Sequence, residues 1–167
     1  NLPKDSAIID VGGGDSFLCD NLIDRGYKNI TVLDISDVAI QRAKIRLGKN
    51  SNKVNWIVSD ILNFKPQKKY AIWHDRAVFH FLKDNNNIKT YINSLSNGLA
   101  KNGRLILGTF AENGPKRCCA LDVKRYSFKE FNKLFSNIFT IVKTQNLIHR
   151  TPFETEQSFN FIEGIKK

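Results

Sequence analysis

The stretch that decides the fold is Ala7-Ile8-Ile9-Asp10-Val11-Gly12-Gly13-Gly14-Asp15-Ser16, an apolar run that ends in an acid and a glycine cluster. Such a run predicts a buried strand that turns sharply into a helix. Gly12 and Gly14 allow the backbone to approach a ligand closely, and the N-terminus of the following helix points to the same place. About twenty residues later, Thr31-Val32-Leu33-Asp34 predicts the next parallel strand, with Asp34 placed to bind a ribose diol. Together these features predict a nucleoside-cofactor site.

The glycine spacing indicates which cofactor is bound. A dinucleotide fingerprint, G-x-G-x-x-G, needs a third glycine where the helix packs on the strand. Counted from Gly12, that position holds Phe17, which is too large for such packing. Asp10 also disfavours a pyrophosphate, because like charges repel. The stretch resembles motif I of class I S-adenosylmethionine-dependent methyltransferases, D/E-x-G-x-G-x-G, with Ser16 in place of the last glycine.

The bulk composition is that of one globular domain. A chain of 167 residues is long enough for one buried core, and 41% hydrophobic and 25% charged residues are ordinary values. We expect a single domain over residues 1–167 that lacks a natural N-terminal segment, because the chain begins at Asn1 and contains no methionine. No apolar run has membrane-spanning length, so no membrane partner is expected. Three cysteines, an odd number, disfavour a disulfide framework and favour a cytoplasmic location.

The formal net charge of +10 has two interpretations. It indicates either a docking surface for nucleic acid or another anionic partner, or an ordinary solvated surface rich in lysine. The basic residues are scattered along the chain rather than gathered in one run. We favour the solvated surface and treat nucleic acid as the second interpretation.

Strands and helices are expected to alternate. The predicted strands are 6–11, 30–34, 54–58, 70–74, 105–110, 138–147 and 159–165, and the predicted helices are 16–25, 36–47, 85–100 and 127–135. This alternation predicts an α/β fold with a parallel, doubly wound sheet. The last two strands are separated only by a loop at 149–158, so we expect them to form an antiparallel pair. The methyltransferase resemblance implies a Rossmann-like, seven-stranded sheet of order 3-2-1-4-5-7-6.

Ligands of open α/β sheets bind outside the carboxyl ends of the strands. The resemblance implies that the glycine cluster holds the methionine moiety of S-adenosylmethionine, that Asp34 binds the ribose, and that Asp60 and Ile61 contact the adenine. For Asp34 and Asp60 the alternative is a capping or loop carboxylate. The complete set of cofactor-binding candidates is Asp10, Gly12, Gly13, Gly14, Asp34, Ile35, Asp60, Ile61 and His74.

The segment 70–82, Tyr-Ala-Ile-Trp-His-Asp-Arg-Ala-Val-Phe-His-Phe-Leu, resembles motif IV of small-molecule methyltransferases. His80 falls on the histidine of that motif, and Asp75 and Arg76 fall where the family places residues beside the transferred methyl group. His149 is expected in the last hairpin loop and is a further candidate base. The catalytic candidates are therefore Asp75, Arg76, His80 and His149. The alternatives are a structural role for His80 and an ion pair between Asp75 and Arg76.

Several motifs are missing. No N/D-P-P-Y/F sequence is present, which disfavours methylation of amino groups on DNA bases or glutamine. No Pro-Cys follows the fourth predicted strand, which disfavours methylation of cytosine at C5. Cys118-Cys119 has no third cysteine or nearby histidine in sequence to complete a metal set, so no metal site is expected.

The resemblance therefore implies a methyltransferase that uses S-adenosylmethionine, releases S-adenosylhomocysteine and acts on a small molecule or an unidentified acceptor. The alternatives are a methyltransferase acting on protein or RNA and a non-catalytic cofactor-binding domain. An NAD-dependent oxidoreductase is a further alternative, which Phe17 disfavours. The acceptor atom and the oligomeric state stay open.

Overall fold

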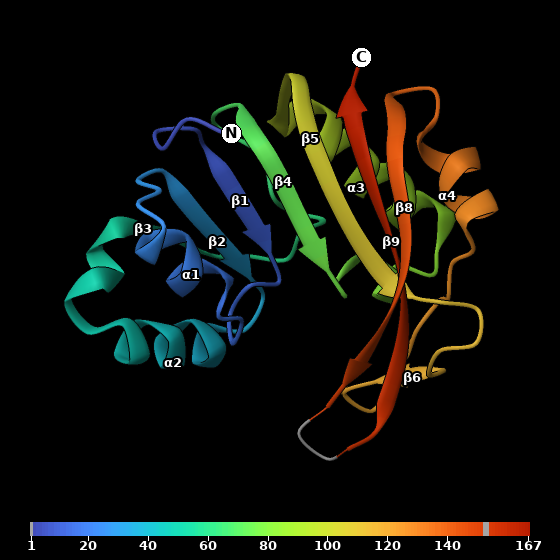
Figure 1. The fold of residues 1–167 in the computed structure, drawn as a ribbon, viewed down its shortest axis with the longest axis horizontal. Helices are drawn as coiled ribbons and strands as arrows, with labels where there is room; N and C mark the ends of the chain where they lie inside the picture. Colours follow the sequence, from blue (N-terminus) through green and yellow to red (C-terminus); the bar gives the residue numbers. More distant parts are fainter. Residues whose placement is uncertain (1, 152–153) are drawn as a thin grey trace.

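One seven-stranded sheet, of order β3-β2-β1-β4-β5-β9-β8, forms the centre of the molecule (Figure 1). The computed structural model describes residues 2–151 and 154–167. The strands of this sheet are β1 (Ile8–Val11), β2 (Ile30–Asp34), β3 (Val54–Val58), β4 (Tyr70–Arg76), β5 (Leu99–Phe110), β8 (Phe139–Arg150) and β9 (Glu156–Lys166). The first five are parallel, and β9 pairs antiparallel with both β5 and β8. The predicted fold class and strand order are confirmed, because the additional short strands β6 (Arg117–Cys118) and β7 (Leu121–Asp122) form a separate pair.

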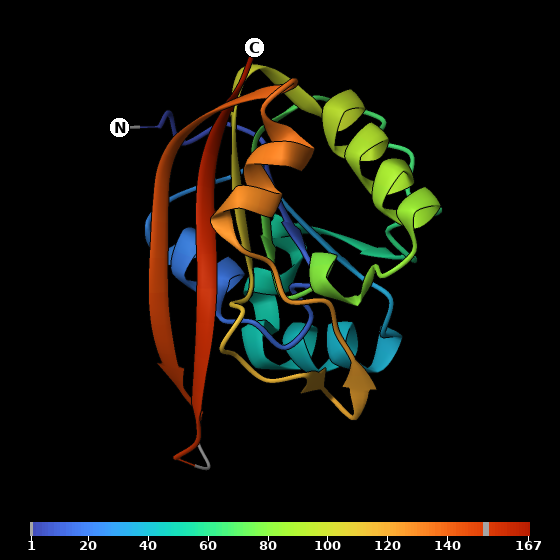
Figure 2. The same ribbon diagram turned by 90° about the vertical axis from the view of Figure 1, so that its right-hand side faces the viewer.

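The helices cover the two faces of the sheet unequally. α1 (Leu18–Asp24) and α2 (Asp37–Leu47) lie over β1–β3, while α3 (Asn85–Gly98) and α4 (Phe128–Phe135) lie together on the opposite face (Figures 1 and 2). Two short 3-10 helices, η1 (Gly48–Lys53) and η2 (Phe79–Phe81), follow α2 and β4. Within the described ranges, no helix is long and apolar enough to cross a membrane.

The two faces have separate apolar cores. The larger core lies against α3 and α4 and is rich in aromatic side chains, among them Trp73, Tyr91, Phe131 and Phe135. The smaller core lies under α1 and α2 and consists of Cys19, Ile30, Val32 and Val54 with their partly buried neighbours. Burial of this much apolar surface is the main stabilisation of the sheet. The strand ends that carry the candidate site lie between these two cores.

Several predicted strand boundaries are wrong, and the largest differences concern β5 and the last hairpin. β5 begins at Leu99, which already pairs with Tyr70, and not at residue 105; a register shift in β4 accommodates this early start. The last hairpin is longer than predicted, because β8 continues through His149 and Arg150, which pair with Gln157 and Glu156. The expectation that His149 lies in a hairpin loop is therefore corrected: it lies in a strand. The ion pair between Arg150 and Glu156 supports this extension.

Candidate active site

The glycine cluster follows β1 and packs tightly on its neighbours. Gly12 has a φ of +72°, and a β-carbon there would lie 2.1 Å from Val78 Cγ2. Its backbone N–H donates to the Leu33 carbonyl over 2.7 Å. A β-carbon at Gly14 would lie 2.8 Å from Asp34 Oδ2. The loop thus occupies a space that only glycine fits, between the end of β2 and the turn after β4.

Asp34, the last residue of β2, connects the glycine loop to α2. Its Oδ2 accepts the Gly14 N–H over 2.9 Å, and its Oδ1 accepts the Ser36 N–H over 2.8 Å. Ser36 in turn caps α2 by accepting the Ala39 N–H. Each carboxylate oxygen retains a lone pair beyond these bonds, so Asp34 has the capacity for two further donors. The next residue, Ile35, is 70% exposed and offers an apolar surface beside that carboxylate.

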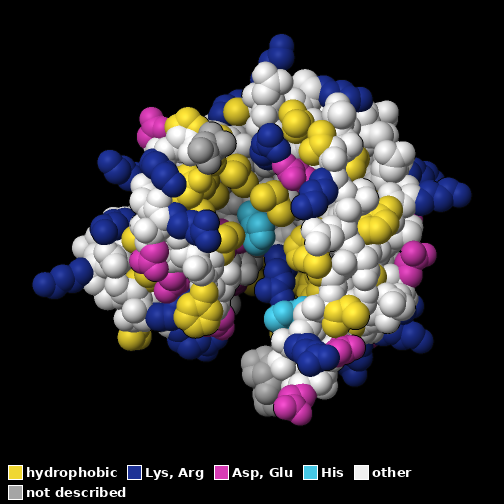
Figure 3. All heavy atoms as spheres, in the orientation of Figure 1, with side chains coloured by type: hydrophobic (Ala, Val, Ile, Leu, Met, Phe, Trp, Pro, Cys, Tyr) yellow, Lys and Arg dark blue, Asp and Glu magenta, His cyan; other side chains and the backbone are white. Residues whose placement is uncertain are grey.

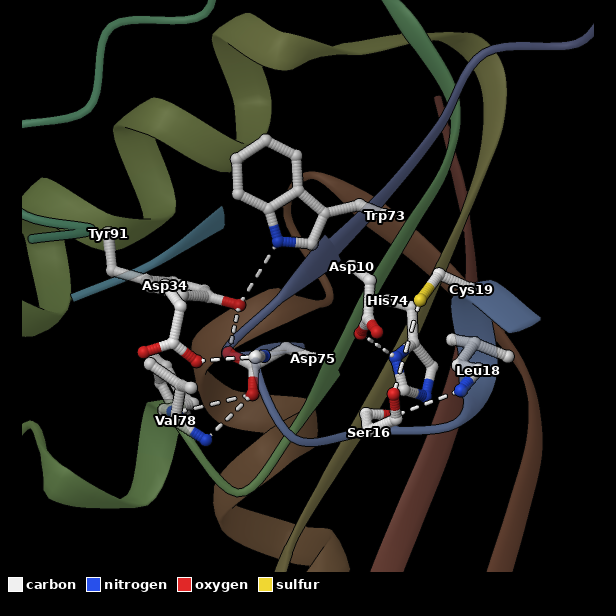
Figure 4. Close-up of polar contacts among 12 residues, drawn as sticks. Asp10, Ser16, Leu18, Cys19, Asp34, Trp73, His74, Asp75, Val78 and Tyr91 are labelled. Carbon is white, nitrogen blue, oxygen red and sulfur yellow. Dashed lines mark hydrogen bonds and ion pairs between the residues drawn. The ribbon is translucent and has the colours of Figure 1, made fainter. Parts of the chain in front are cut away.

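Beneath the loop, the buried Asp10 pairs with the partly buried His74. They are register partners on β1 and β4, and His74 Nδ1 lies 2.7 Å from Asp10 Oδ1 (Figure 4). The other oxygen, Oδ2, is buried and has no hydrogen-bond partner among the described residues. A β-carbon at Gly13 would lie 2.4 Å from that oxygen. A buried carboxylate oxygen without a donor is costly, so this position fits a ligand that brings a donor or a positive charge.

Asp60 and Ile61 follow β3. Asp60 Oδ1 accepts the Leu62 N–H over 2.9 Å, which is the geometry of an Asx turn. Ile61 is buried in the larger core. In this structure Asp60 therefore serves the turn. Two exposed apolar side chains lie at the carboxyl ends of the neighbouring strands: Ile35, which follows β2, and Val58, the last residue of β3. Val58 was not among the sequence candidates.

Asp75 faces the larger core, not the open strand ends. Its Oδ2 accepts the Tyr91 hydroxyl over 2.6 Å, and the Trp73 indole N–H donates to the same hydroxyl over 3.2 Å (Figure 4). Its Oδ1 accepts the N–H groups of Val78 and Phe79. Burial raises the pKa of Asp75 to about 6. The prediction that Asp75 acts as a catalytic base is corrected, because its side chain is buried in the larger core. There it holds the turn after β4.

His80 is also fully buried. It lies in η2 with its ring 4.7 Å from the Phe81 ring and 4.8 Å from the Phe110 ring. Neither ring nitrogen has a partner among the described residues, and burial lowers the pKa of His80 to about 4. A neutral, enclosed imidazole does not contact a substrate. The structure therefore favours the structural interpretation of His80 over the catalytic one.

Arg76 and His149 lie on the open side of the sheet around one aromatic ring. The guanidinium carbon of Arg76 is 5.3 Å from the Phe159 ring centroid, and the His149 ring is 6.4 Å from the same centroid, edge to face. The predicted alternative, an ion pair between Asp75 and Arg76, does not form, because adjacent residues of a strand face opposite sides. Phe159 was missed by the sequence candidates, since nothing local marks a strand residue that contacts a distant strand end.

A hollow on this side of the molecule separates the part built by β1–β3 from the projecting ends of β8 and β9 (Figure 3). Basic and histidine side chains line it. Cys118 and Cys119, in β6 and the turn after it, are free thiols. In the ranges 2–151 and 154–167, no group of three or more His, Cys, Asp or Glu side chains is arranged to hold a metal ion.

Comparison with known proteins gives a family match over most of the chain. A family model described as a methyltransferase domain matches residues 2–157. The chain is 32% identical over 108 residues to malonyl-[acyl-carrier protein] O-methyltransferase 1 of Ilyobacter polytropus, covering 64% of this chain and 39% of that protein. It is 31% identical over 90 residues to nodulation protein S of Rhizobium fredii, which covers 54% of this chain and 51% of that protein. The chain therefore spans about two fifths of the first relative's length and about half of the second's.

Solved structures share the fold. A SAM-dependent methyltransferase from Methanosarcina mazei has a TM-score of 0.80 at 18% identity, over 99% of this chain and 94% of that one. The N-methyltransferase NodS from Bradyrhizobium japonicum, in complex with S-adenosyl-L-homocysteine, has a TM-score of 0.76 at 20% identity. The match covers 96% of this chain and 78% of that one. The whole described fold is thus that of these proteins.

Proposed function

The chain belongs to the methyltransferase domain family, and from this premise we propose that it transfers the methyl group of S-adenosylmethionine to a small-molecule acceptor. The observation that carries the proposal is the contact between Asp34 and the glycine loop. A strand-end carboxylate with spare acceptor capacity, bonded to Gly14 N–H, is the arrangement that binds a nucleoside diol. The named methyltransferase relatives and the neighbour that holds S-adenosylhomocysteine support the same cofactor.

Each cofactor-binding residue would contact a different part of S-adenosylmethionine. We assign the ribose to Asp34, an apolar adenine contact to Ile35, and the amino group of the methionine moiety to the unpartnered oxygen of Asp10. His74 holds the other oxygen of Asp10 and so positions it. For the adenine amino group, Asp60 stays our candidate. S-adenosylmethionine carries the methyl group on a positively charged sulfonium sulfur. When the methyl group is transferred, the rest of the cofactor leaves as a neutral thioether.

Methyl transfer is an in-line displacement, which needs alignment and exclusion of water more than acid–base chemistry. Because Asp75 and His80 are enclosed, they do not take a proton from the acceptor. Asp75 holds the turn after β4 through the N–H groups of Val78 and Phe79, and His80 packs against the rings of Phe81 and Phe110. Where the acceptor is protonated, His149 is our candidate base, since it faces the open side beside Phe159. Arg76 is proposed to orient the acceptor. We also propose a cytoplasmic location, for which the free thiols at Cys19, Cys118 and Cys119 are the support.

Calorimetric titration with S-adenosylhomocysteine tests the proposal. We expect the wild-type protein to bind it and Asp34→Ala to bind at least about tenfold more weakly, because hydrogen bonds to charged groups contribute about 1.5–3 kcal/mol. The matched control is Asp37→Ala, an exposed aspartate at the start of α2 that makes the same charge change.

NAD is the comparison ligand in the same titration. Binding of NAD without binding of S-adenosylhomocysteine would overturn the proposal in favour of an oxidoreductase. Equal affinities of the wild type and Asp34→Ala for S-adenosylhomocysteine would remove the assigned ribose contact.

A further inference from the structure

Arg76 differs from most arginines of this protein in lacking a polar partner. Five arginines form ion pairs with carboxylates, and Arg125 donates to backbone carbonyls. Among the described residues, the Arg76 side chain makes neither an ion pair nor a hydrogen bond; its one contact of note is with the Phe159 ring. Arg25 also lacks a polar partner, but it follows α1, at the edge where the parallel strands begin. Arg76 is thus the unpaired guanidinium at the edge where they end.

The sheet places Arg76, an exposed side chain, beside the rings of Phe159, which is buried, and Phe161, which is partly buried. Arg76 is the last residue of β4 and lies on the same face as His74, two residues earlier. Its register partner on β5 is Gly108, and Gly108 pairs with Phe161 on β9. A β-carbon at Gly108 would lie 2.3 Å from the Phe161 ring, so this ring occupies the space above the glycine. The rings of Phe161 and Phe159 are stacked, 5.9 Å apart.

We propose that Arg76 and Phe159 form a subsite that binds the carboxylate of an anionic acceptor with an apolar body. The inference rests on the proposed function, whose acceptor it describes. A guanidinium presents two parallel N–H donors that match a carboxylate, and it stays charged at any working pH. Its stacking on Phe159 restricts the side chain before the ligand arrives, which reduces the entropy that binding costs. Two carboxylates of β9 have arginine partners of their own: Glu156 pairs with Arg150 and Glu163 with Arg104.

The same sheet face offers a place for the apolar body. A groove there is lined by four apolar side chains and three polar or charged ones: Ile106, Leu147, Phe161 and Ile162, with Lys143, Gln145 and Glu163. Leu147 is exposed, although it is a large apolar side chain. A neutral acceptor would leave the guanidinium of Arg76 without a charged partner, and an acceptor without an apolar part would leave the apolar side chains of the groove uncovered. The arrangement therefore selects for molecules that carry both a negative charge and an apolar part.

4-Fluorobenzoate, titrated by fluorine NMR in the presence and absence of S-adenosylhomocysteine, tests the subsite. We expect Arg76→Gln to bind it at least tenfold more weakly than the wild type, and Phe159→Leu to bind it a few-fold more weakly. The matched control is Arg25→Gln, which makes the same charge change at the other unpaired arginine and is expected to bind like the wild type. 4-Fluorobenzamide, the neutral analogue, is expected to bind the wild type more weakly than 4-fluorobenzoate does. Its affinity for Arg76→Gln is expected to equal its affinity for the wild type.

Each contrary result has a distinct meaning. Failure of the wild type to bind 4-fluorobenzoate, equal binding by Arg76→Gln, or equal binding of the amide would overturn the carboxylate subsite while leaving the proposed function intact. Failure of the wild type to bind S-adenosylhomocysteine would instead count against the proposed function. The titration of 4-fluorobenzoate without S-adenosylhomocysteine would still show whether Arg76 binds a carboxylate. Thermal unfolding of Arg76→Gln checks that this exposed substitution leaves the fold unchanged.

Discussion

At the scale of single residues, Asp75 shows how burial decides the role of an ionisable group. The sequence motif places Asp75 beside the transferred methyl group, yet the side chain turns into the core and accepts three hydrogen bonds there. The neighbouring Arg76, one residue later, faces the open side. Because successive side chains of a strand face opposite sides, Asp75 can only position the turn, whereas Arg76 can contact a ligand.

The raised pKa of Asp75 predicts a specific pH dependence of stability. Because its pKa is about 6 in the folded state and near 3.8 unfolded, the unfolded chain ionises first as the pH rises. This carboxyl therefore contributes most below about pH 4, and its contribution is lost between about pH 4 and 6, to a limit of about 3 kcal/mol. We expect urea unfolding from pH 4 to 7 to show this fall in the wild type, with a smaller fall in Asp75→Asn.

Tyr91→Phe is the companion variant. The Tyr91 hydroxyl donates to Asp75 and favours its charged form. Its removal is expected to cost about 1–3 kcal/mol, and more at pH 7 than at pH 4.5. A pH profile of Asp75→Asn that follows the wild type throughout would show that other groups produce the slope.

At the scale of elements, a local cap signal predicts where a helix begins, whereas the apolar pattern of a helix is a weaker guide to the face that meets the sheet. Ser127 and Glu130 form a capping box at the start of α4, where a helix is predicted from residue 127, and this signal is local. In contrast, Phe17 is 63% exposed and Ile45 is 81% exposed, although both are large apolar residues within the predicted helices 16–25 and 36–47. α2 instead turns Ala39, Ile40 and Ala43 inward. Apolar residues occur on more than one side of these helices, so periodicity alone does not decide which side meets the sheet.

The candidate site was predictable as far as it depends on strand ends. Gly12–Gly14 and Asp34 were placed by the rule that ligands bind at the carboxyl ends of parallel strands, and the structure brings them together. The contacts of Asp75 with Tyr91 and of Arg76 with Phe159 were not predictable, because they join residues distant in sequence. The length of β8 was missed for another reason: an edge strand with both faces exposed lacks a hydrophobic alternation that marks its end.

The glycine loop and the turn after β4 are expected to be coupled through Gly12. Gly12→Ala would place a β-carbon against Val78, in addition to the strain of a positive φ. Gly26→Ala is the matched control, because Gly26 has a φ of +83° and nothing within 4 Å of its β-carbon position. We expect Gly26→Ala to lose about 1 kcal/mol of stability and Gly12→Ala about 2–4 kcal/mol. Chemical denaturation measures both.

Affinity for S-adenosylhomocysteine separates the local from the global effect of these two variants. Gly12→Ala is expected to bind at least about tenfold more weakly and Gly26→Ala like the wild type, because only Gly12 belongs to the loop. If the two glycine variants lose equal stability, contact with Val78 contributes nothing beyond backbone strain.

At the scale of the whole molecule, the charge of +10 is spread out rather than concentrated. Ion pairs with neighbouring acids engage Arg42, Arg46, Arg104, Arg117 and Arg150. On the face that carries the hollow, basic side chains alternate with acidic and neutral ones around the outline (Figure 3). Such pairs are worth little in stability at an exposed surface, but they reduce the positive potential available to a polyanion.

This distribution predicts weak binding of RNA and so separates a small-molecule acceptor from an RNA acceptor. With S-adenosylhomocysteine present at 150 mM salt, a fluorescein-labelled single-stranded RNA should bind no more tightly than non-specific contacts allow, roughly 10⁻⁴–10⁻⁶ M. The measurement is fluorescence anisotropy between 50 and 300 mM salt, with the same oligonucleotide and a protein of similar net charge as the control. Nanomolar binding with a steep salt dependence would reverse the assignment, since it requires many cations to contact phosphates together. In that case the scattered lysines form the docking surface, and Arg76 would be expected to meet a phosphate instead of a carboxylate.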